Sequence, residues 1–93
     1  MATRLSETEI ETRLNLLSKW QREADGITRQ WEFSGFPAAI RFVNTVAGLA
    51  EEANHHPDID IRWNKVLLRL STHSAGGLTA EDFALADKID RLP

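Results

Sequence analysis

The chain has 93 residues, of which 42% are hydrophobic and 27% charged, the composition of an ordinary globular domain. A net charge of −3 without any lysine- or arginine-rich run argues against non-specific nucleic-acid binding, and the absence of cysteine excludes disulfides, thiolate zinc sites and cysteine nucleophiles. The chain start lacks the form of a secretory signal, and no apolar stretch is long enough to span a membrane. We expect one domain over residues 1–93, and a reducing cytoplasm fits the lack of cysteine.

Residues 7–18 have the apolar spacing of a helix. Ser6 and Glu9 stand three apart, so the serine hydroxyl can accept from the Glu9 amide while the glutamate accepts from the Ser6 amide. Ile10, Leu14 and Leu17 then recur every three or four positions. This pattern predicts an amphipathic helix with a capping box at its start.

A β-hairpin is predicted next, with Asp25-Gly26 as its turn, because glycine tolerates the positive φ that two-residue hairpin turns need. In this register Trp20 pairs with Trp31, and Arg22 pairs with Arg29. The second pair places like charges opposite each other, which is unfavourable. The conflict counts against the register but not against the hairpin.

The longest predicted helix covers residues 37–55. Pro37 suits a first helical turn, and Pro57 disfavours helical geometry at His56, so the helix should end near the histidine pair. A broad apolar stripe along the helix predicts that it lies on a sheet. The stripe consists of Phe36, Ile40, Val43, Ala47 and Ala50, flanked by Phe42, Val46, Leu49 and Ala53.

A second hairpin is predicted with Asn64-Lys65 as a two-residue turn. Its pairs would sort into one apolar face and one largely polar face, which supports the register. The apolar pairs are Trp63–Val66, Ile61–Leu68 and Ile59–Leu70, and the polar face contains Arg62–Leu67, Asp60–Arg69 and Asp58–Ser71. Carried further, this register sets His56 opposite His73, so distant histidines would converge.

The last segment, from Thr79 onward, has a plausible N-cap followed by partial helical spacing at Phe83, Ala86 and Ile89. The expected order is therefore helix, two strands, helix, two strands, helix. Such alternation predicts an α+β fold in which helices pack on one face of a four-stranded antiparallel sheet.

The three histidines are candidates for acid–base chemistry. Glu51 and His55 are four apart and should face the same way on the long helix, with His56 about 100° further round. Histidine side chains can exchange protons near neutral pH, as general acid–base catalysis requires. The alternative is that His55, His56 and Pro57 form only a polar helix terminus. The predicted approach of His73 favours the catalytic interpretation.

Asp82 also has two interpretations. It stands three residues after Thr79 and can complete a capping box, or it can accept an imidazole N–H and orient a histidine. A metal site is a less favoured alternative, because adjacent histidines on one helix diverge and could not share an ion without unwinding. A second less favoured alternative is a binding site for a flat heterocycle with an aromatic wall, because aromatic side chains in strands usually pack into the core. The wall would consist of Trp20, Trp31, Phe33 and Trp63.

The spacing of these residues resembles the signature of the pterin-4a-carbinolamine dehydratase family. That signature is an acidic residue, three positions, His-His-Pro, then an aromatic residue, a histidine and an aspartate at set distances. In the segment "EEANHHPDIDIRWNKVLLRLSTHSAGGLTAED" its positions are Glu51, His55, His56, Pro57, Trp63, His73 and Asp82. Trp63 stands where relatives often have tyrosine. The resemblance covers most of residues 5–91.

The resemblance implies a hydro-lyase that removes water from 4a-hydroxytetrahydropterin to give quinonoid dihydropterin, recycling the cofactor of aromatic amino-acid hydroxylases. It implies no metal or organic cofactor. His55 and His73 would perform acid–base catalysis, and His56 would bind the pterin and share in proton transfer. Glu51 and Asp82 would tune or orient the histidines. The expected pterin-binding residues are Asn54, His55, His56, Pro57, Trp63, Ser71, Thr72, His73 and Ser74.

The resemblance also bears on partners. Members of the family form dimers or tetramers, and some animal members bind a transcription factor as a dimerisation cofactor. A homodimer or homotetramer is therefore expected, with no direct contact to nucleic acid or membrane. The alternative function is a binding module that stabilises a partner. Because a pure binding module has no need of all three histidines, the enzyme is favoured.

Overall fold

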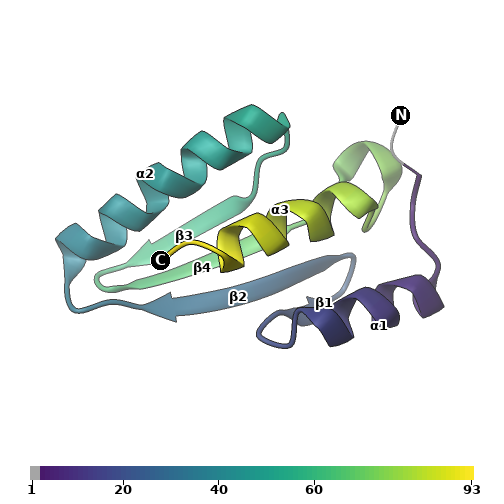
Figure 1. Cartoon of the computed structure of the whole chain (residues 1–93), viewed down its shortest axis with the longest axis horizontal. Coiled ribbons are helices and arrows are strands. Elements are labelled where there is room, and N and C mark those ends of the chain that lie inside the picture. Colours follow the sequence, from purple (N-terminus) through teal and green to yellow (C-terminus); the bar gives the residue numbers. More distant parts are fainter. Residues whose placement is uncertain (1–2) are drawn as a thin grey trace.

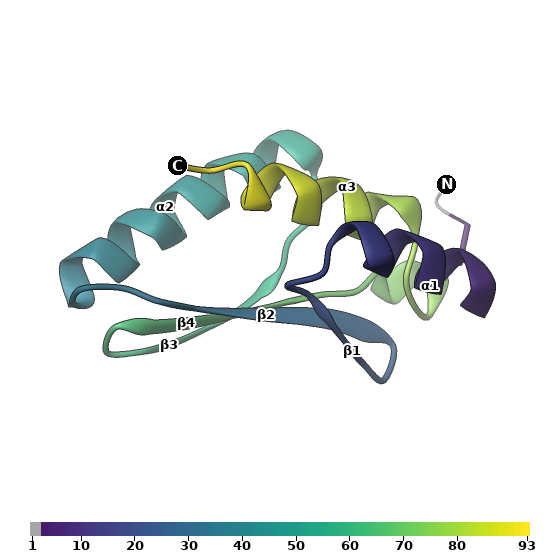
Figure 2. The same cartoon turned by 60° about the horizontal axis from the view of Figure 1, so that its bottom comes forward.

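The computed structural model describes residues 3–93 as a four-stranded antiparallel sheet with three α-helices on one of its faces (Figures 1 and 2). The elements are α1 (Glu7–Leu16), β1 (Gln21–Glu23), β2 (Gly26–Glu32), α2 (Phe36–Ala53), β3 (Asp58–Arg62), β4 (Lys65–Leu70), the short 3-10 helix η1 (His73–Ala75) and α3 (Ala80–Asp90). The strand order is β1-β2-β4-β3. The predicted α+β class and element order are confirmed. Within residues 3–93, no helix has the length and apolar character to cross a membrane.

The starts of α1 and α3 follow from local sequence. At α1 the Ser6 hydroxyl accepts from the Glu9 amide at 3.2 Å, and the Glu9 carboxylate accepts from the Ser6 amide at 3.0 Å. The predicted capping box is confirmed, although the helix ends at Leu16 instead of residue 18. At α3 Thr79 and Asp82 make the second capping box. Both helices therefore begin where their side chains satisfy the free amides.

The first hairpin forms, but the predicted turn is wrong. The turn residues are Ala24 and Asp25, with Ala24 at φ 51°, and Arg22 pairs with Ile27 instead of with another arginine. The reason lies in the neighbouring strand β4. A Cβ on Gly26 would lie only 2.9 Å from the Leu70 carbonyl oxygen, so this glycine serves close strand approach and not the turn.

The second hairpin turn is also displaced by one residue from its prediction. The turn residues are Trp63 and Asn64, so Ile61 pairs with Val66 and the predicted pairs are wrong, including His56 opposite His73. Asn64 is buried against the end of β2, where its Nδ2 donates to the Phe33 carbonyl at 2.9 Å and its backbone carbonyl accepts from the Phe33 amide at 2.8 Å. A turn displaced by one residue shifts every strand partner by two, as from Leu68 to Val66 opposite Ile61. Because side chains alternate with a period of two, each one kept its predicted face of the sheet.

The core lies between the sheet and the helices. Strand β4 contributes three side chains that are fully buried, Val66, Leu68 and Leu70. The predicted stripe of α2 is only partly correct, because Phe36 is 49% exposed and Ala47 is exposed. The buried face is rotated toward residues of the predicted flank, since α2 packs against α3 as well as β4. The buried residues of α2 are Ala39, Val46 and Ala50.

Most of the aromatic residues are structural. Trp20 and Trp31 meet edge to face with ring centroids 5.8 Å apart, although they are not strand partners. Trp31 also packs on Phe42, and Phe42 on Phe33. The exception is Trp63, whose residue surface is 69% exposed in the β3–β4 turn. The predicted wall of Trp20, Trp31, Phe33 and Trp63 therefore does not form around a ligand.

Candidate active site

The site begins at the C-terminal end of α2. Asn54 takes a left-handed conformation (φ 50°, ψ 44°), and the His55 amide donates back to the Ala50 carbonyl at 3.0 Å. Asparagine tolerates this conformation better than most residues, so the local sequence can end the helix here without glycine. The turn changes the direction of the chain between Glu51 and the two histidines. His55 consequently points toward α3, whereas His56 points to solvent.

His55 contacts a buried carboxylate from the first turn of α3. Its Nε2 lies 2.5 Å from Oδ1 of Asp82, whose side chain is fully buried, while the His55 side chain is only 10% exposed. The other oxygen of Asp82 accepts from the Thr72 hydroxyl at 2.8 Å and from the Thr79 amide at 2.9 Å. The capping box and the histidine contact, predicted as alternatives, are both present.

This arrangement selects the tautomer of His55. Because Oδ2 of Asp82 already accepts two hydrogen bonds, Oδ1 is left to accept from the imidazole. We therefore assign the proton to Nε2, which leaves Nδ1 as the nitrogen available for exchange. A carboxylate that holds one imidazole nitrogen in this way is a common arrangement in acid–base sites.

His56 has a different partner and a different environment. Its Nε2 lies 2.5 Å from Oε2 of Glu51, and both side chains are largely exposed. Glu51 was expected to lie beside His55, but the left-handed Asn54 changes the helical phase between them. The site therefore holds two imidazole–carboxylate pairs, one buried and one open to solvent.

His73 is exposed at the start of η1, directly after Thr72. Gly76, in the left-handed conformation at φ 72°, closes this loop by donating its amide to the His73 carbonyl at 3.1 Å. Thr72 is 5% exposed and donates to Asp82, so Asp82 connects the His55 segment to the loop that carries His73. The segments do come together, but through α3 instead of through strand pairing.

Other predicted pocket residues have protein partners of their own. The Ser71 hydroxyl donates to the Asp25 carbonyl at 2.8 Å, and the Thr72 hydroxyl is taken up by Asp82 and Thr79. Ser74 is exposed in η1. Pro57, which directly follows His56, is partly buried. Trp63 follows β3, so the five residues of that strand, about 17 Å in length, separate it from the histidine pair. Trp63 is not brought to the histidines within this chain.

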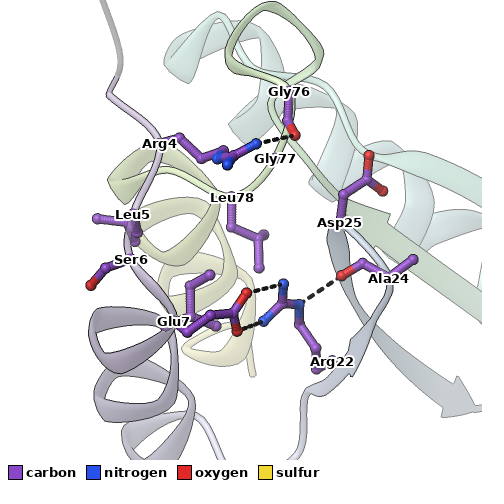
Figure 3. A pocket seen from close by; sticks show the side chains of 11 residues that line it. Arg4, Leu5, Ser6, Glu7, Arg22, Ala24, Asp25, Gly76, Gly77 and Leu78 are labelled. Atoms are coloured by element: carbon purple, nitrogen blue, oxygen red, sulfur yellow. Dashed lines mark hydrogen bonds and ion pairs between the residues drawn. The ribbon is translucent and has the colours of Figure 1, made fainter.

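A hollow of about 280 Å³ lies behind the His73 loop, a feature that sequence reasoning missed (Figure 3). Arg22 crosses it to Glu7 with two hydrogen bonds of 2.9 and 3.2 Å, and these hold the pKa of the Glu7 carboxyl below its ordinary value. The N-terminal segment backs the loop, because the Leu5 amide donates to the Leu78 carbonyl at 2.9 Å. No local sequence signal joins segments this far apart.

The β1–β2 turn borders both the hollow and the His73 loop. Asp25 accepts a 2.6 Å hydrogen bond from Arg69, which is the main reason that the pKa of its carboxyl is lowered, and the charge of His73 contributes less. Within residues 3–93, no group of three or more His, Cys, Asp or Glu side chains is arranged to hold a metal ion.

Comparison with known proteins shows the family to which the chain is related. Residues 3–92 match the pterin 4 alpha carbinolamine dehydratase family. A protein of Roseiflexus sp. (strain RS-1), provisionally named a pterin-4-alpha-carbinolamine dehydratase, is 58% identical over 92 residues, which cover 99% of each chain. A crystal structure described as a transcriptional coactivator/pterin dehydratase from Brucella melitensis aligns with a TM-score of 0.90 and 36% identity, covering 95% of this chain and 96% of that one.

A more distant structure has the same fold. It is described as a pterin dehydratase-like protein identified as a RuBisCO assembly factor in the alpha-carboxysome, and it aligns with a TM-score of 0.62 at 22% identity over 76% of this chain and 82% of that one. The match to residues 3–92 and the 58% identity both span almost the whole chain. The chain therefore belongs to the pterin 4 alpha carbinolamine dehydratase family.

Proposed function

We propose that the chain removes water from 4a-hydroxytetrahydropterin to give quinonoid dihydropterin, by histidine acid–base catalysis without a metal. The observation that carries this proposal is the His55–Asp82 pair beside the loop of His73. Membership of the dehydratase family supports it. The product would return to the pterin cycle of aromatic amino-acid hydroxylases, and a cysteine-free chain fits a cytoplasmic location for that work.

The reaction needs two proton transfers. The C4a–O bond breaks as the oxygen takes a proton and leaves as water, and a ring nitrogen gives up its proton as the C=N bond forms. His55 and His73 are assigned to these transfers, because one is oriented by a buried carboxylate and the other is exposed at the loop next to it. The exposed His56–Glu51 pair is assigned to pterin binding, with a share in proton transfer.

The direct test is a stopped-flow measurement of 4a-hydroxytetrahydropterin dehydration, with and without the protein. We expect the wild type to accelerate the reaction over its spontaneous rate, and His73→Ala to lose about 10²- to 10⁴-fold of that acceleration, the usual contribution of a general acid or base. A chelator should leave the wild-type rate unchanged. A folded wild type without acceleration would refute the dehydratase proposal, and inhibition by chelator would refute the metal-free mechanism.

Self-association is a further part of the proposal. Strand β3 is an outer strand of the sheet, and all five of its residues are exposed. Ile59 and Ile61 remain 39% and 36% exposed on the face that the helices otherwise cover. An open edge with apolar side chains favours pairing with a second copy of the chain. We assign this edge to a homodimer or homotetramer contact.

Replacing Ile61 with aspartate should shift the protein toward the monomer, because a charge would be buried at the pairing edge. Sedimentation velocity at matched concentrations measures this shift. Leu16→Asp is the control, since Leu16 is also exposed (81%) but lies on α1, away from β3. A wild type that is monomeric at all concentrations, or equal effects of the two variants, would count against this interface.

The alternative function is a coactivator-type binding module on the same fold. The Brucella melitensis structure is described with both a coactivator and a dehydratase role, which favours keeping this candidate. The exposed edge of β3 can pair with a strand of a different protein in the same way as with a second copy of this chain. A protein that binds a partner but fails the stopped-flow assay would support the module over the enzyme.

A further inference from the structure

Glu81 lies at the nitrogen of His55 that Asp82 does not hold. Its Oε2 is 3.8 Å from Nδ1 of His55, slightly beyond hydrogen-bond distance. The two side chains differ in their access to water, since His55 is 10% exposed and Glu81 is 53% exposed. The signature spacing does not include Glu81. Its carboxylate is therefore the solvent-facing neighbour of an otherwise enclosed imidazole.

The proposed reaction requires His55 to be reset after every turnover. One catalytic group gives a proton to the leaving oxygen and another takes a proton from the ring nitrogen, so both end in the wrong protonation state. The overall reaction, from the hydroxylated pterin to the dihydropterin and water, neither consumes nor releases a proton. Whether His55 acts as acid or base, one proton must therefore pass between it and its surroundings before the next cycle.

Within residues 3–93, the contacts of His55 favour its Nδ1 side as the route for that proton. Nε2 of His55 is engaged by Asp82, which is fully buried and offers no path to water. Nδ1 faces Glu81, and a gap of 3.8 Å can be closed by a small side-chain movement or by one bridging water. The other nearby carboxylate of the site, Glu51, is paired with His56.

We propose that Glu81 exchanges protons between Nδ1 of His55 and solvent after product release. This inference rests on the proposed dehydratase function. In the acid case, protonated Glu81 gives its proton to Nδ1 and regains one from water. In the base case, Nδ1–H gives its proton to the Glu81 carboxylate, which releases it to water. No bond other than those to the moving proton changes.

A purely structural role for Glu81 has different consequences. The residue lies in the first turn of α3, where its amide donates to the Thr79 hydroxyl at 3.3 Å and its negative charge favours the helix N-terminus. Loss of that charge would lower the stability of α3 by an amount that buffer does not restore. Buffer dependence of turnover therefore separates proton exchange from helix stabilisation.

The experiment compares wild type with Glu81→Gln, which keeps the shape of the side chain and removes the carboxylate that can bind and release a proton. Glu52→Gln is the matched control, because Glu52 is an exposed carboxylate in the last turn of α2, three residues before His55, and makes no histidine contact within residues 3–93. At low buffer concentration and saturating pterin, we expect kcat of Glu81→Gln to fall roughly tenfold with KM little changed. Added small buffers such as imidazole should restore kcat. Wild type and Glu52→Gln should not respond.

An unchanged kcat at low buffer, or a loss that buffer does not relieve, would overturn the inference. A second measurement does not depend on turnover. Followed by NMR across a pH series at low buffer concentration, the ring resonances of His55 should stay sharp in wild type, should broaden in Glu81→Gln, and should sharpen again on buffer addition. Equal line widths would reject Glu81 as the exchange group even if the protein proves not to be a dehydratase.

Discussion

Replacing Asp82 with asparagine is expected to lower kcat for dehydration by about two to four orders of magnitude while the fold persists. Oδ2 of Asp82 accepts from the Thr79 amide at 2.9 Å, so the asparagine must place its carbonyl oxygen there to keep the helix cap. Its amide NH₂ then points at Nε2 of His55, where it can only donate. His55 must switch its proton to Nδ1, the wrong tautomer for exchange.

Stopped-flow kinetics measures the loss, and ring-nitrogen NMR of His55 measures the tautomer. The matched control is Asp87→Asn on the same helix, whose carboxylate pairs with Arg91 on the surface at 3.0 Å. That variant should keep wild-type activity. Full activity of Asp82→Asn, or a His55 proton that stays on Nε2 in that variant, would show that the carboxylate does not set the tautomer.

Replacing Gly26 with alanine should destabilise the protein by about 1–3 kcal/mol, the usual cost of forcing a methyl group into a packed site. The added Cβ would lie 2.9 Å from the Leu70 carbonyl oxygen and 2.7 Å from the guanidinium carbon of Arg69. Arg69 can move, but it would lose its 2.6 Å contact with Asp25. The backbone oxygen can move only if β2 and β4 separate.

Gly48→Ala is the matched substitution with the opposite expected sign. Gly48 lies within α2, and a Cβ there would meet nothing within 4 Å. Alanine is favoured over glycine in a helix interior, so this variant should gain about 0.5–1 kcal/mol. Urea unfolding of both variants gives the two values. If Gly26→Ala were as stable as wild type, close approach to Leu70 could not explain the displaced turn.

The candidate site depends on one carboxylate that joins three segments. Asp82 caps α3, accepts from Thr72 before the His73 loop, and meets His55 after α2. The sequence predicted the first and third of these contacts as alternatives. A carboxylate has two oxygens and several acceptor positions, so it can do both when it is buried between the segments. The Thr72 contact was not predicted, because Thr72 was assigned to pterin binding and no motif spacing links it to Asp82.

The strand registers show where local reasoning stops. Asp25-Gly26 has the strongest local turn chemistry in its hairpin, yet Gly26 lies in β2 because β4 leaves no room for a side chain there. In the other hairpin, Asn64 is the second turn residue instead of the first, in the position where its side chain and backbone both bond to Phe33. Turn propensities differ by little, and a buried steric conflict or a pair of cross-strand hydrogen bonds outweighs them.

The sequence by itself determined the α+β class, both capping boxes, the approximate helices, the strand faces and the family signature. These follow from spacing within short segments, where helical and strand periods and capping chemistry act locally. Only the tertiary structure decided the turns, the buried face of α2, the pairing of His55 with Asp82 and of His56 with Glu51, and the distance of Trp63 from the histidines. Those features depend on which distant segments meet, and on the left-handed turn at Asn54 that aims the two histidines apart.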